Sequence, residues 1–357
     1  MLTKFSLHPG TAPTPVVSGS GILSAELACL LAGSDKPTAV FVVCDDRVYR
    51  LHQRPLRTAV PKSAQWFLFR SAESAKSETS LHRILTWLHR LHADRRSLLL
   101  AIGGGVVTDL AGLAASLYMR GIPYAAVPTT LVCQVDAAIG GKTAINFLGV
   151  KNIVGVFCAP RIVVCDHDFL TTLTEPQVRD GLVEAFKIFC VHDSRLWRRF
   201  TQTHLSRAAA ADFHRLIDAA VRLKTDIVNR DPFERDLRRI LNFGHTAGHA
   251  YEALTGQSHG HSVAFGIQIA LELSVRHAGL NEKDRDQCEA VFLALYSHFD
   301  FAGATPHRLW SKIQHDKKRQ GDRIQFVLLK SCGNHRIRSV DYREFAAAVA
   351  AVKRRIA

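Results

Sequence analysis

Histidines at helical spacing are the first chemical feature of the sequence. In LNFGHTAGHAYEAL (241–254), His245 and His249 lie four residues apart, so both imidazoles would project from one face of a helix toward one metal ion. In SHGHSVAFG (258–266), His259 and His261 stand at a turn that leads into another helix. These four histidines in one part of the chain indicate a metal site. Histidines that only cap helices or face solvent are the alternative.

A carboxylate and a lysine upstream could complete such a site. GLVEAFKIF (181–189) sets Glu184 and Lys187 three residues apart, on a helical face that otherwise carries apolar side chains. Charged groups are costly to bury in apolar surroundings unless they are paired or bound to a metal. Either Glu184 is a metal ligand, or the two side chains simply pair with each other, and the spacing allows both.

Three consecutive glycines indicate a phosphate-binding turn. The apolar run SLLLAI (97–102) leads directly into Gly103, Gly104 and Gly105, and a helix follows to roughly Tyr118. Glycines allow a ligand to approach the backbone closely, and the N–H groups at a helix start attract phosphate. Thr108 occupies the place of the third glycine in GxGxxG, so a purely structural turn stays open beside a nucleotide site.

The elements that must position these residues change character along the chain. Apolar runs at 38–44, 97–102, 124–130 and 161–166 fit strands buried on both faces, and 80–92 has apolar residues at helical spacing, which is typical of parallel βαβ units. From about 175 onward long amphipathic helices prevail until a strand-like run at 323–330. We predict an α/β nucleotide-binding domain with a parallel sheet over 1–175, followed by a mainly α-helical metal-binding domain over 176–357.

Polar residues follow two of these strands. Asp45 comes at the end of the run 38–44, where acidic groups often bind a ribose hydroxyl, and Thr129 and Thr130 end the run 124–130. Ligands of open α/β sheets bind at the carboxyl ends of the strands. We therefore expect these side chains and the three glycines at the same edge of the sheet.

Composition narrows the class of protein. The 357 residues are 47% hydrophobic, which suffices for two packed domains, and the formal net charge of +14 favours an anionic partner, either nucleic acid or a phosphorylated metabolite. The sequence lacks long apolar runs and a secretory N-terminal pattern, so we expect a cytoplasmic protein. The eight cysteines are scattered and include no CxxC pair, so we expect buried free thiols.

Six motifs, taken in order, make the sequence resemble the 3-dehydroquinate synthases within the sugar phosphate cyclases. They are the segment 103–146 that begins GGGVVTDLAG, then KNIVG, GLVEAFK, LNFGHTAGHAYEA, HGHSVAFG and HDKK, and the match spans roughly 40–330. The resemblance implies cyclisation of 3-deoxy-arabino-heptulosonate 7-phosphate with phosphate elimination, using NAD for a transient oxidation and Zn²⁺ (or Co²⁺) as Lewis acid. It also implies a homodimer with a phosphorylated sugar as substrate, and neither nucleic acid nor membrane as partner.

The resemblance also implies the role of individual residues. The metal ligands would be Glu184, His245 and His259. The NAD site would contain Asp45, Glu73, Lys76, Gly104, Gly105, Val106, Asp109, Thr129, Thr130, Phe169, Thr172 and Leu173. The catalytic residues around the substrate would be Asp136, Lys142, Lys187, Lys224, Arg238, Asn242 and His249. The substrate phosphate would contact Lys151, Asn152, one of the pair Lys317–Lys318, assigned here to Lys318, and Arg120 from the other subunit.

Departures from the family pattern leave other functions open. NFLGVKN (146–152) lacks a histidine–proline step, Thr108 stands in VVTDLAG, and His261 replaces a usual glutamate, as in the branch that cyclises sedoheptulose 7-phosphate to valiolone-type products. Arg238, Asn242 and His249 resemble the dehydroquinate type, which we favour. A metal-dependent polyol dehydrogenase of the glycerol dehydrogenase kind would share the architecture but would not need Lys142, Lys151 and Lys318. Charge alone motivates a nucleic-acid binder.

Overall fold

The protein folds into two compact units. The structure is a computed structural model that describes residues 2–7, 13–33, 35–201, 210–314, 319–320 and 323–356. The first unit contains Met1–Val178 and Ile217–Phe233, and the second contains Arg179–Leu216 and Glu234–Ala357.

The units differ from the predicted division in the segment Ile217–Phe233, which includes the second half of helix α8 (Ala210–Arg230). Polar side chains tie this segment to the first unit. Asp218 accepts a hydrogen bond of 2.6 Å from Ser18, and Lys224 pairs with Asp136. These long-range contacts have no local sequence signal.

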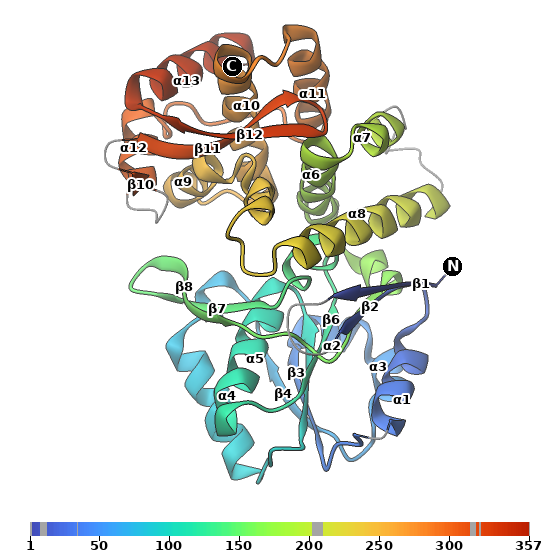
Figure 1. The fold of residues 1–357 in the computed structure, drawn as a ribbon. Helices are drawn as coiled ribbons and strands as arrows, with labels where there is room; N and C mark the ends of the chain where they lie inside the picture. Colours follow the sequence, from blue (N-terminus) through green and yellow to red (C-terminus); the bar gives the residue numbers. More distant parts are fainter. Residues whose placement is uncertain are drawn as a thin grey trace. The chain divides into compact units, whose positions relative to one another are not determined.

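A seven-stranded sheet forms the centre of the first unit (Figure 1). Its strand order is β1-β2-β9-β6-β5-β3-β4, and every neighbouring pair is parallel except β1 and β2. The strands are β1 (Thr3–Leu7), β2 (Thr14–Gly19), β3 (Val40–Asp45), β4 (Gln65–Phe69), β5 (Leu98–Gly103), β6 (Tyr124–Pro128) and β9 (Val163–Asp166). Four of them, β3, β5, β6 and β9, confirm the strands expected from the apolar runs.

Helices cover both faces of this sheet (Figure 1). They are α1 (Leu23–Ala32), α2 (Asp46–Leu51), α3 (Gln53–Ala59), α4 (Glu78–Arg90) and α5 (Gly105–Leu117). In β5, Leu98, Leu100 and Ile102 pack with residues of α1 and α3, whereas Leu99 and Ala101 pack with residues of α4 and α5. Because successive side chains point to opposite faces and both faces are covered, the strand is apolar throughout.

Short elements follow the central strands or form a separate hairpin. The short helical turns are η1 (Glu73–Ala75), η2 (Tyr118–Arg120), η3 (Cys133–Ala137) and η4 (His167–Thr172). Strands β7 (Lys142–Phe147) and β8 (Val150–Phe157) pair antiparallel outside the main sheet. This hairpin was not expected from the sequence, because its apolar residues face both ways and several are exposed, Leu148 at 86%.

The second unit is mainly helical, as predicted. Its helices are α6 (Glu175–His192), α7 (Ser194–Thr201), η6 (Leu237–Asn242), α9 (His245–Thr255), α10 (His259–Ala278), α11 (Glu282–Leu295), α12 (Pro306–Gln314) and α13 (Tyr342–Ile356). The expected strand is β11 (Arg323–Ser331), which lies between β10 (Arg319–Gln320) and the unexpected β12 (Asn334–Val340) in an antiparallel sheet. A core that includes Phe265, Trp310 and Phe345 joins this sheet to the helices.

Two further expectations can be compared with the fold. Among the described residues, no helix has the length and apolar character needed to cross a lipid bilayer. All eight cysteines are free thiols, but the expectation that they are buried is wrong for Cys29, which is exposed, and only partly right for Cys158 and Cys332.

A buried ion pair fixes the start of α5 to the loop after η1. The amine of Lys76, which is 5% exposed, donates to the carboxylate of Asp109 and to the side-chain oxygen of Asn152. Burial raises the pKa of Asp109 to about 6, against the opposing effect of the Lys76 charge. Because this folded-state pKa exceeds the ordinary value of 3.8, the Asp109 carboxyl lowers stability as the pH rises from about 4 to about 6.

Replacing Lys76 by Met should therefore destabilise the fold in a pH-dependent way. At pH 8 the variant would bury an ionised Asp109 without its cation, at a cost of about 3 kcal/mol. At pH 5 Asp109 is mostly protonated in both proteins, so the loss should be much smaller. Urea denaturation at the two pH values measures the difference.

Two controls accompany this measurement. Lys62→Met removes an exposed lysine of the same unit and should leave stability unchanged at both pH values. The double variant Lys76→Met/Asp109→Asn should recover most of the loss at pH 8, since no buried charge remains. An equal loss at pH 5 and pH 8 would contradict the assigned role of the ion pair.

Candidate active site

Three helices bring Glu184, His245 and His259 together in the second unit. Glu184 lies in α6 and is fully buried, while His245 and His259 are the first residues of α9 and α10. Glycines make this approach possible. A Cβ at Gly260 would lie 2.3 Å from the Cα of Asp180, so α10 begins directly against α6, and Gly244 starts α9 with a φ of +78°.

The spacing of the three side chains fits a metal ion. Glu184 Oε1 lies 3.3 Å from His259 Nε2 and 3.6 Å from His245 Nε2, and all three ligand atoms lie within 4.8 Å of one another. Ligand bonds of about 2.0–2.2 Å in a tetrahedral site place ligand atoms roughly 3.3–3.6 Å apart. One carboxylate and two imidazoles also leave a coordination position open, as a catalytic zinc site requires.

Further acceptors orient both imidazoles. His245 Nδ1 lies 3.2 Å from the carbonyl oxygen of Phe243, and His259 Nδ1 lies 3.4 Å from Glu252 Oε2. With the proton held on Nδ1, each Nε2 keeps its lone pair for a metal. Glu252 was not predicted, although its position seven residues after His245 places it on the same helical face.

Positive charge compensates the buried carboxylate. Lys187 Nζ lies 2.6 Å from Glu184 Oε2 and donates to the Leu241 carbonyl at 2.6 Å. Burial alone would raise the pKa of Glu184, but Lys187 and His259 hold it well below its usual range. Burial lowers and the carboxylates of Glu184 and Glu252 raise the pKa of His259, with a net rise to about 10. A proton and a metal ion would therefore compete for this position.

The other predicted residues of the second unit surround this centre to different degrees. The ring of His249 lies 5.1 Å from that of His245 and 6.0 Å from that of His259, and its side chain is exposed. Arg238 is buried in η6, and Asn242 donates to Glu234 at 2.6 Å. Lys318 and its neighbour Lys317 lie outside the described residues.

His261 lies apart from the three candidate ligands. Its Nε2 is 2.8 Å from the carbonyl oxygen of His298, and its ring packs against Tyr296 and Phe299 at centroid distances of 4.9 and 5.1 Å. Burial lowers its pKa. A glutamate in this aromatic environment would bury a charge, whereas the His261 ring packs against the aromatic side chains.

The triple-glycine segment forms a tight turn from β5 into α5. A Cβ at Gly103 would lie 2.4 Å from a methyl carbon of Val107, so this position requires glycine. The amides of Val107 and Thr108 donate to the Gly104 carbonyl, at 3.0 and 3.1 Å. The amides of Gly105 and Val106, in the first turn of the helix, are then placed to meet an anion. The turn therefore fits a nucleotide phosphate.

Predicted NAD residues gather at the carboxyl edge of this sheet. The Thr129 amide donates to the Gly103 carbonyl at 3.0 Å, and a Cβ at Gly104 would lie 3.2 Å from the Thr130 methyl. Asp45 ends β3, where its carboxylate accepts from the amides of Arg47 and Val48 and from Ser71. Asp45 therefore caps α2, a structural role that sequence reasoning missed.

Two other groups of predicted cofactor residues lie in the first unit. Glu73 accepts a hydrogen bond of 2.8 Å from Asn146, which was not predicted and which also accepts from the Asn152 amide at 3.0 Å. In η4, Phe169 packs against the ring of His52, and Thr172 bonds the same histidine at 2.8 Å. Leu173 follows as the C-cap of this turn.

A cavity adjoins η4. It has a volume of about 190 Å³ and is lined in part by His52, Pro55 and Phe169. That volume is smaller than a typical ligand pocket. It could therefore hold only a part of a dinucleotide.

The predicted phosphate contacts of the first unit lie on the hairpin and on η2. Lys142 and Lys151 are exposed on β7 and β8, and Asn152 adopts a φ of +54° while it contacts Lys76. Arg120 is exposed and has a φ of +65°, an uncommon conformation that marks a constrained turn. The remaining two predicted residues, Asp136 and Lys224, form the ion pair between η3 and α8.

The interaction between Glu252 and His259 gives a test of the metal centre. Glu252→Gln removes the carboxylate that holds the His259 Nδ1 proton, so we expect zinc affinity to fall by about 10–100-fold. Competition with a chromophoric chelator measures this affinity. Glu282→Gln, at an exposed position of α11, is the matched control. Unchanged zinc binding by Glu252→Gln would contradict the orienting role assigned to Glu252.

Comparison with known proteins places the chain in a family. Residues 66–180 match the family model described as 3-dehydroquinate synthase N-terminal, and residues 181–319 match 3-dehydroquinate synthase C-terminal. The chain is 34% identical over 341 residues to 3-dehydroquinate synthase of Shouchella clausii, which covers 94% of each protein. It is 40% identical over 253 residues to 2-epi-valiolone synthase of Actinosynnema mirum, which covers 69% of this chain and 66% of that one.

A solved structure agrees with these matches. The 2-epi-5-epi-valiolone synthase of Streptomyces hygroscopicus, with NAD⁺ and Zn²⁺ bound, superposes with a TM-score of 0.85 at 27% identity, covering 97% of this chain and 98% of that one. The family predicted from the six motifs is thus confirmed, together with the enzyme class and the fold. The chain belongs to the 3-dehydroquinate synthase family of sugar phosphate cyclases.

Proposed function

We propose that the protein is a 3-dehydroquinate synthase that cyclises 3-deoxy-arabino-heptulosonate 7-phosphate and eliminates phosphate. The main support is the match of both halves of the chain to this family, with 34% identity over 94% of its length. The geometry supports the same activity, because Glu184, His245 and His259 can reach one ion.

Each cofactor has residues that fit it. When bound, NAD would accept and return a hydride, and Zn²⁺ (or Co²⁺) would polarise the oxygen that is oxidised. Gly104, Gly105 and Val106 would hold the pyrophosphate at the start of α5. Lys187 would keep Glu184 ionised as a ligand, and Glu252 would keep the Nε2 of His259 available.

The substrate requires cations for two anionic groups. Lys142, Lys151 and Asn152 on the hairpin, with Lys318, would bind the phosphate, because lysine ammonium groups act as mobile point charges for phosphate oxygens. Arg238 and Lys224 would bind the carboxylate and hydroxyl groups of the substrate. Asn242 and His249 would bind its ring oxygens. The burial of Arg238 and Lys224 strengthens such contacts, since water does not screen them.

A second candidate substrate is sedoheptulose 7-phosphate. The 40% identity to 2-epi-valiolone synthase over 253 residues favours it, as do NFLGVKN and His261. This sugar phosphate lacks the carboxylate of the first candidate. Only the first candidate substrate therefore offers a carboxylate for Arg238 to bind.

Phosphate release by the purified protein with NAD and zinc or cobalt tests the proposal. We expect turnover of 3-deoxy-arabino-heptulosonate 7-phosphate, and turnover of sedoheptulose 7-phosphate alone would overturn it. Glu184→Gln should abolish both turnover and bound metal, with Glu282→Gln as the matched control. Growth of absorbance at 340 nm with a simple polyol would instead indicate a dehydrogenase.

We further propose that the enzyme is a homodimer in which Arg120 contacts the substrate phosphate of the other subunit. The exposure of Arg120 supports this role, because an exposed guanidinium on a constrained turn is available to contact another subunit.

Mixed dimers provide the test of that role. Arg120→Ala and Glu184→Gln should each be nearly inactive alone. In an equal mixture, half of the dimers are hybrids with one intact site of two, so about a quarter of wild-type activity should return. If Arg120 acts within its own subunit, the mixture stays inactive. A monomeric active enzyme would also contradict the proposal.

A further inference from the structure

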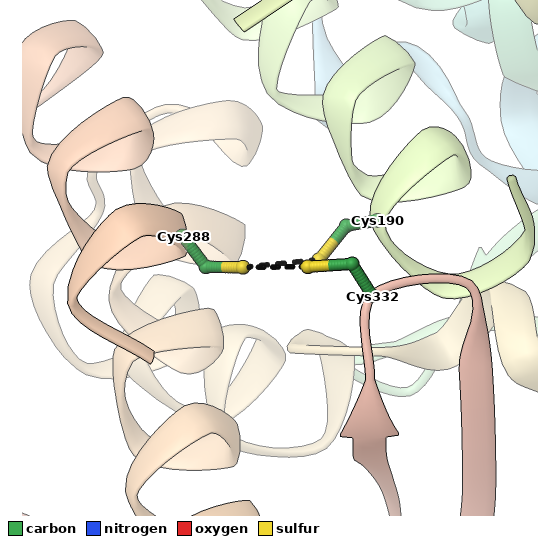
Figure 2. Close-up of side chains that lie close together, drawn as sticks. All are labelled: Cys190, Cys288 and Cys332. Atoms are coloured by element: carbon green, nitrogen blue, oxygen red, sulfur yellow. Dashed lines mark hydrogen bonds between the residues drawn. The ribbon is translucent and has the colours of Figure 1, made fainter. Parts of the chain in front are cut away.

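Three cysteine side chains converge in the second unit, in a group that shares no residue with the candidate ligands Glu184, His245 and His259. Cys190 lies near the end of α6, Cys288 lies in α11, and Cys332 lies in the turn between β11 and β12 (Figure 2). Cys288 Sγ is 3.8 Å from Cys190 Sγ and 3.3 Å from Cys332 Sγ, and the three sulfur atoms all lie within 4.8 Å of one another. We call these residues the thiol cluster.

We propose that the thiol cluster is a structural binding site for a soft, thiophilic metal ion, with Cu⁺ as the best match. Thiolates select Cu⁺, zinc and iron–sulfur clusters among biological metals. Structural zinc takes four protein ligands, whereas this group consists of three sulfur atoms. Metal–sulfur bonds of about 2.3 Å imply sulfur separations of roughly 3.8–4.0 Å, so binding requires only a small expansion.

The thiol cluster lies in apolar surroundings, where a bound cation would compensate the charge of the thiolates. Cys190 and Cys288 are fully buried. Phe186 and Phe292, one helical turn from these two cysteines, both pack against Trp197, at centroid distances of 6.2 and 6.1 Å. Thiolates in such an apolar setting need a cation to compensate them. An ion bound here would therefore be tightly held and shielded from water.

Cys332 provides a place for the ion to enter. It is partly exposed, whereas Cys190 and Cys288 are buried, so an ion can reach its sulfur atom from solvent. Thiolate is the form that binds metals. An ion could bind first to Cys332 and then displace the protons of the two buried thiols, which would pass to solvent.

The rigidity of the turn favours a metal site over a disulfide. The Gly333 amide donates to the Cys190 carbonyl at 2.8 Å, and a Cβ at Gly333 would lie 2.8 Å from the Ser194 amide nitrogen. A disulfide needs sulfur atoms about 2.05 Å apart, so the closer pair would have to approach by roughly a further ångström. It would also leave the third sulfur without a partner. A metal ion engages all three sulfur atoms near their present positions.

A competition experiment with Cu⁺ tests the proposal. The reduced, full-length protein, with zinc already supplied, is titrated under anaerobic conditions against a colorimetric Cu⁺ chelator. We expect one tightly bound Cu⁺ per chain, with three sulfur neighbours in its X-ray absorption spectrum. The melting temperature should rise on Cu⁺ loading, because the ion joins α6, α11 and the turn.

Variants separate the thiol cluster from the other sites. Cys332→Ser should weaken Cu⁺ binding by at least about tenfold and abolish the rise in melting temperature. Cys158→Ser, at a partly exposed cysteine of the first unit, should bind like the wild type, and so should Glu184→Gln.

Three results would overturn the proposal. They are no Cu⁺ retained by the wild type against the chelator, fewer than three sulfur neighbours, or equal binding by Cys332→Ser. If the wild type retains no Cu⁺ and protein purified without reductant contains a Cys288–Cys332 disulfide, the thiol cluster serves redox chemistry instead. If the wild type retains no Cu⁺ and no disulfide is found, the three thiols only fill space in the core. The wild-type spectrum decides even if a variant fails to fold.

Discussion

Burying a negative charge requires a positive charge beside it, and this constraint shapes both units. Glu184 is fully buried and lies against Lys187 and two histidines. Asp109 is compensated by Lys76, and Asp136 pairs with Lys224. Removing one partner of a buried pair costs several kcal/mol, so each pair restricts how its helices can pack. The residues predicted to serve chemistry therefore also determine the local architecture.

Backbone geometry adds the second constraint. The parallel strands β3, β5 and β6 end at one edge, and the polar residues that follow them meet there because parallel strands share a direction. Gly103 allows the chain to turn at once into α5, and Gly260 allows α10 to begin against α6. Neither position has room for a methyl group. Glycine at these two positions thus allows neighbouring elements, and the polar side chains that they carry, to lie close together.

Much of this could be predicted from the sequence. Short apolar runs predict buried strands, and two histidines four residues apart predict that both side chains lie on one face of a helix. The six motifs identified the family, which the comparisons confirmed. Features that depend on tertiary packing had no such signal. They are the attachment of the Ile217–Phe233 segment to the first unit, the capping role of Asp45, and the hairpin with exposed Leu148. The same holds for the three cysteines that meet although the first and the last lie about a hundred and forty residues apart.

The individual site assignments remain predictions of a different kind. Glu184 and His259 could be proposed as ligands because a family motif contains them, whereas Glu252 could not, because its role depends on how α9 and α10 meet. The candidate alternative, that Glu184 and Lys187 simply pair, proved compatible with a metal centre rather than opposed to it. One carboxylate oxygen faces Lys187 and the other faces the two imidazoles.

The two-sided contacts of this carboxylate have a consequence for the proposed metal centre before an ion binds. In many small zinc proteins the ligands repel one another when the ion leaves, and the fold is lost. Here Lys187 and a protonated His259 compensate the charge of Glu184, so the proposed centre has no uncompensated charge when no ion is bound. We therefore expect the second unit to keep its fold without the proposed ion, so that one divalent ion can replace another.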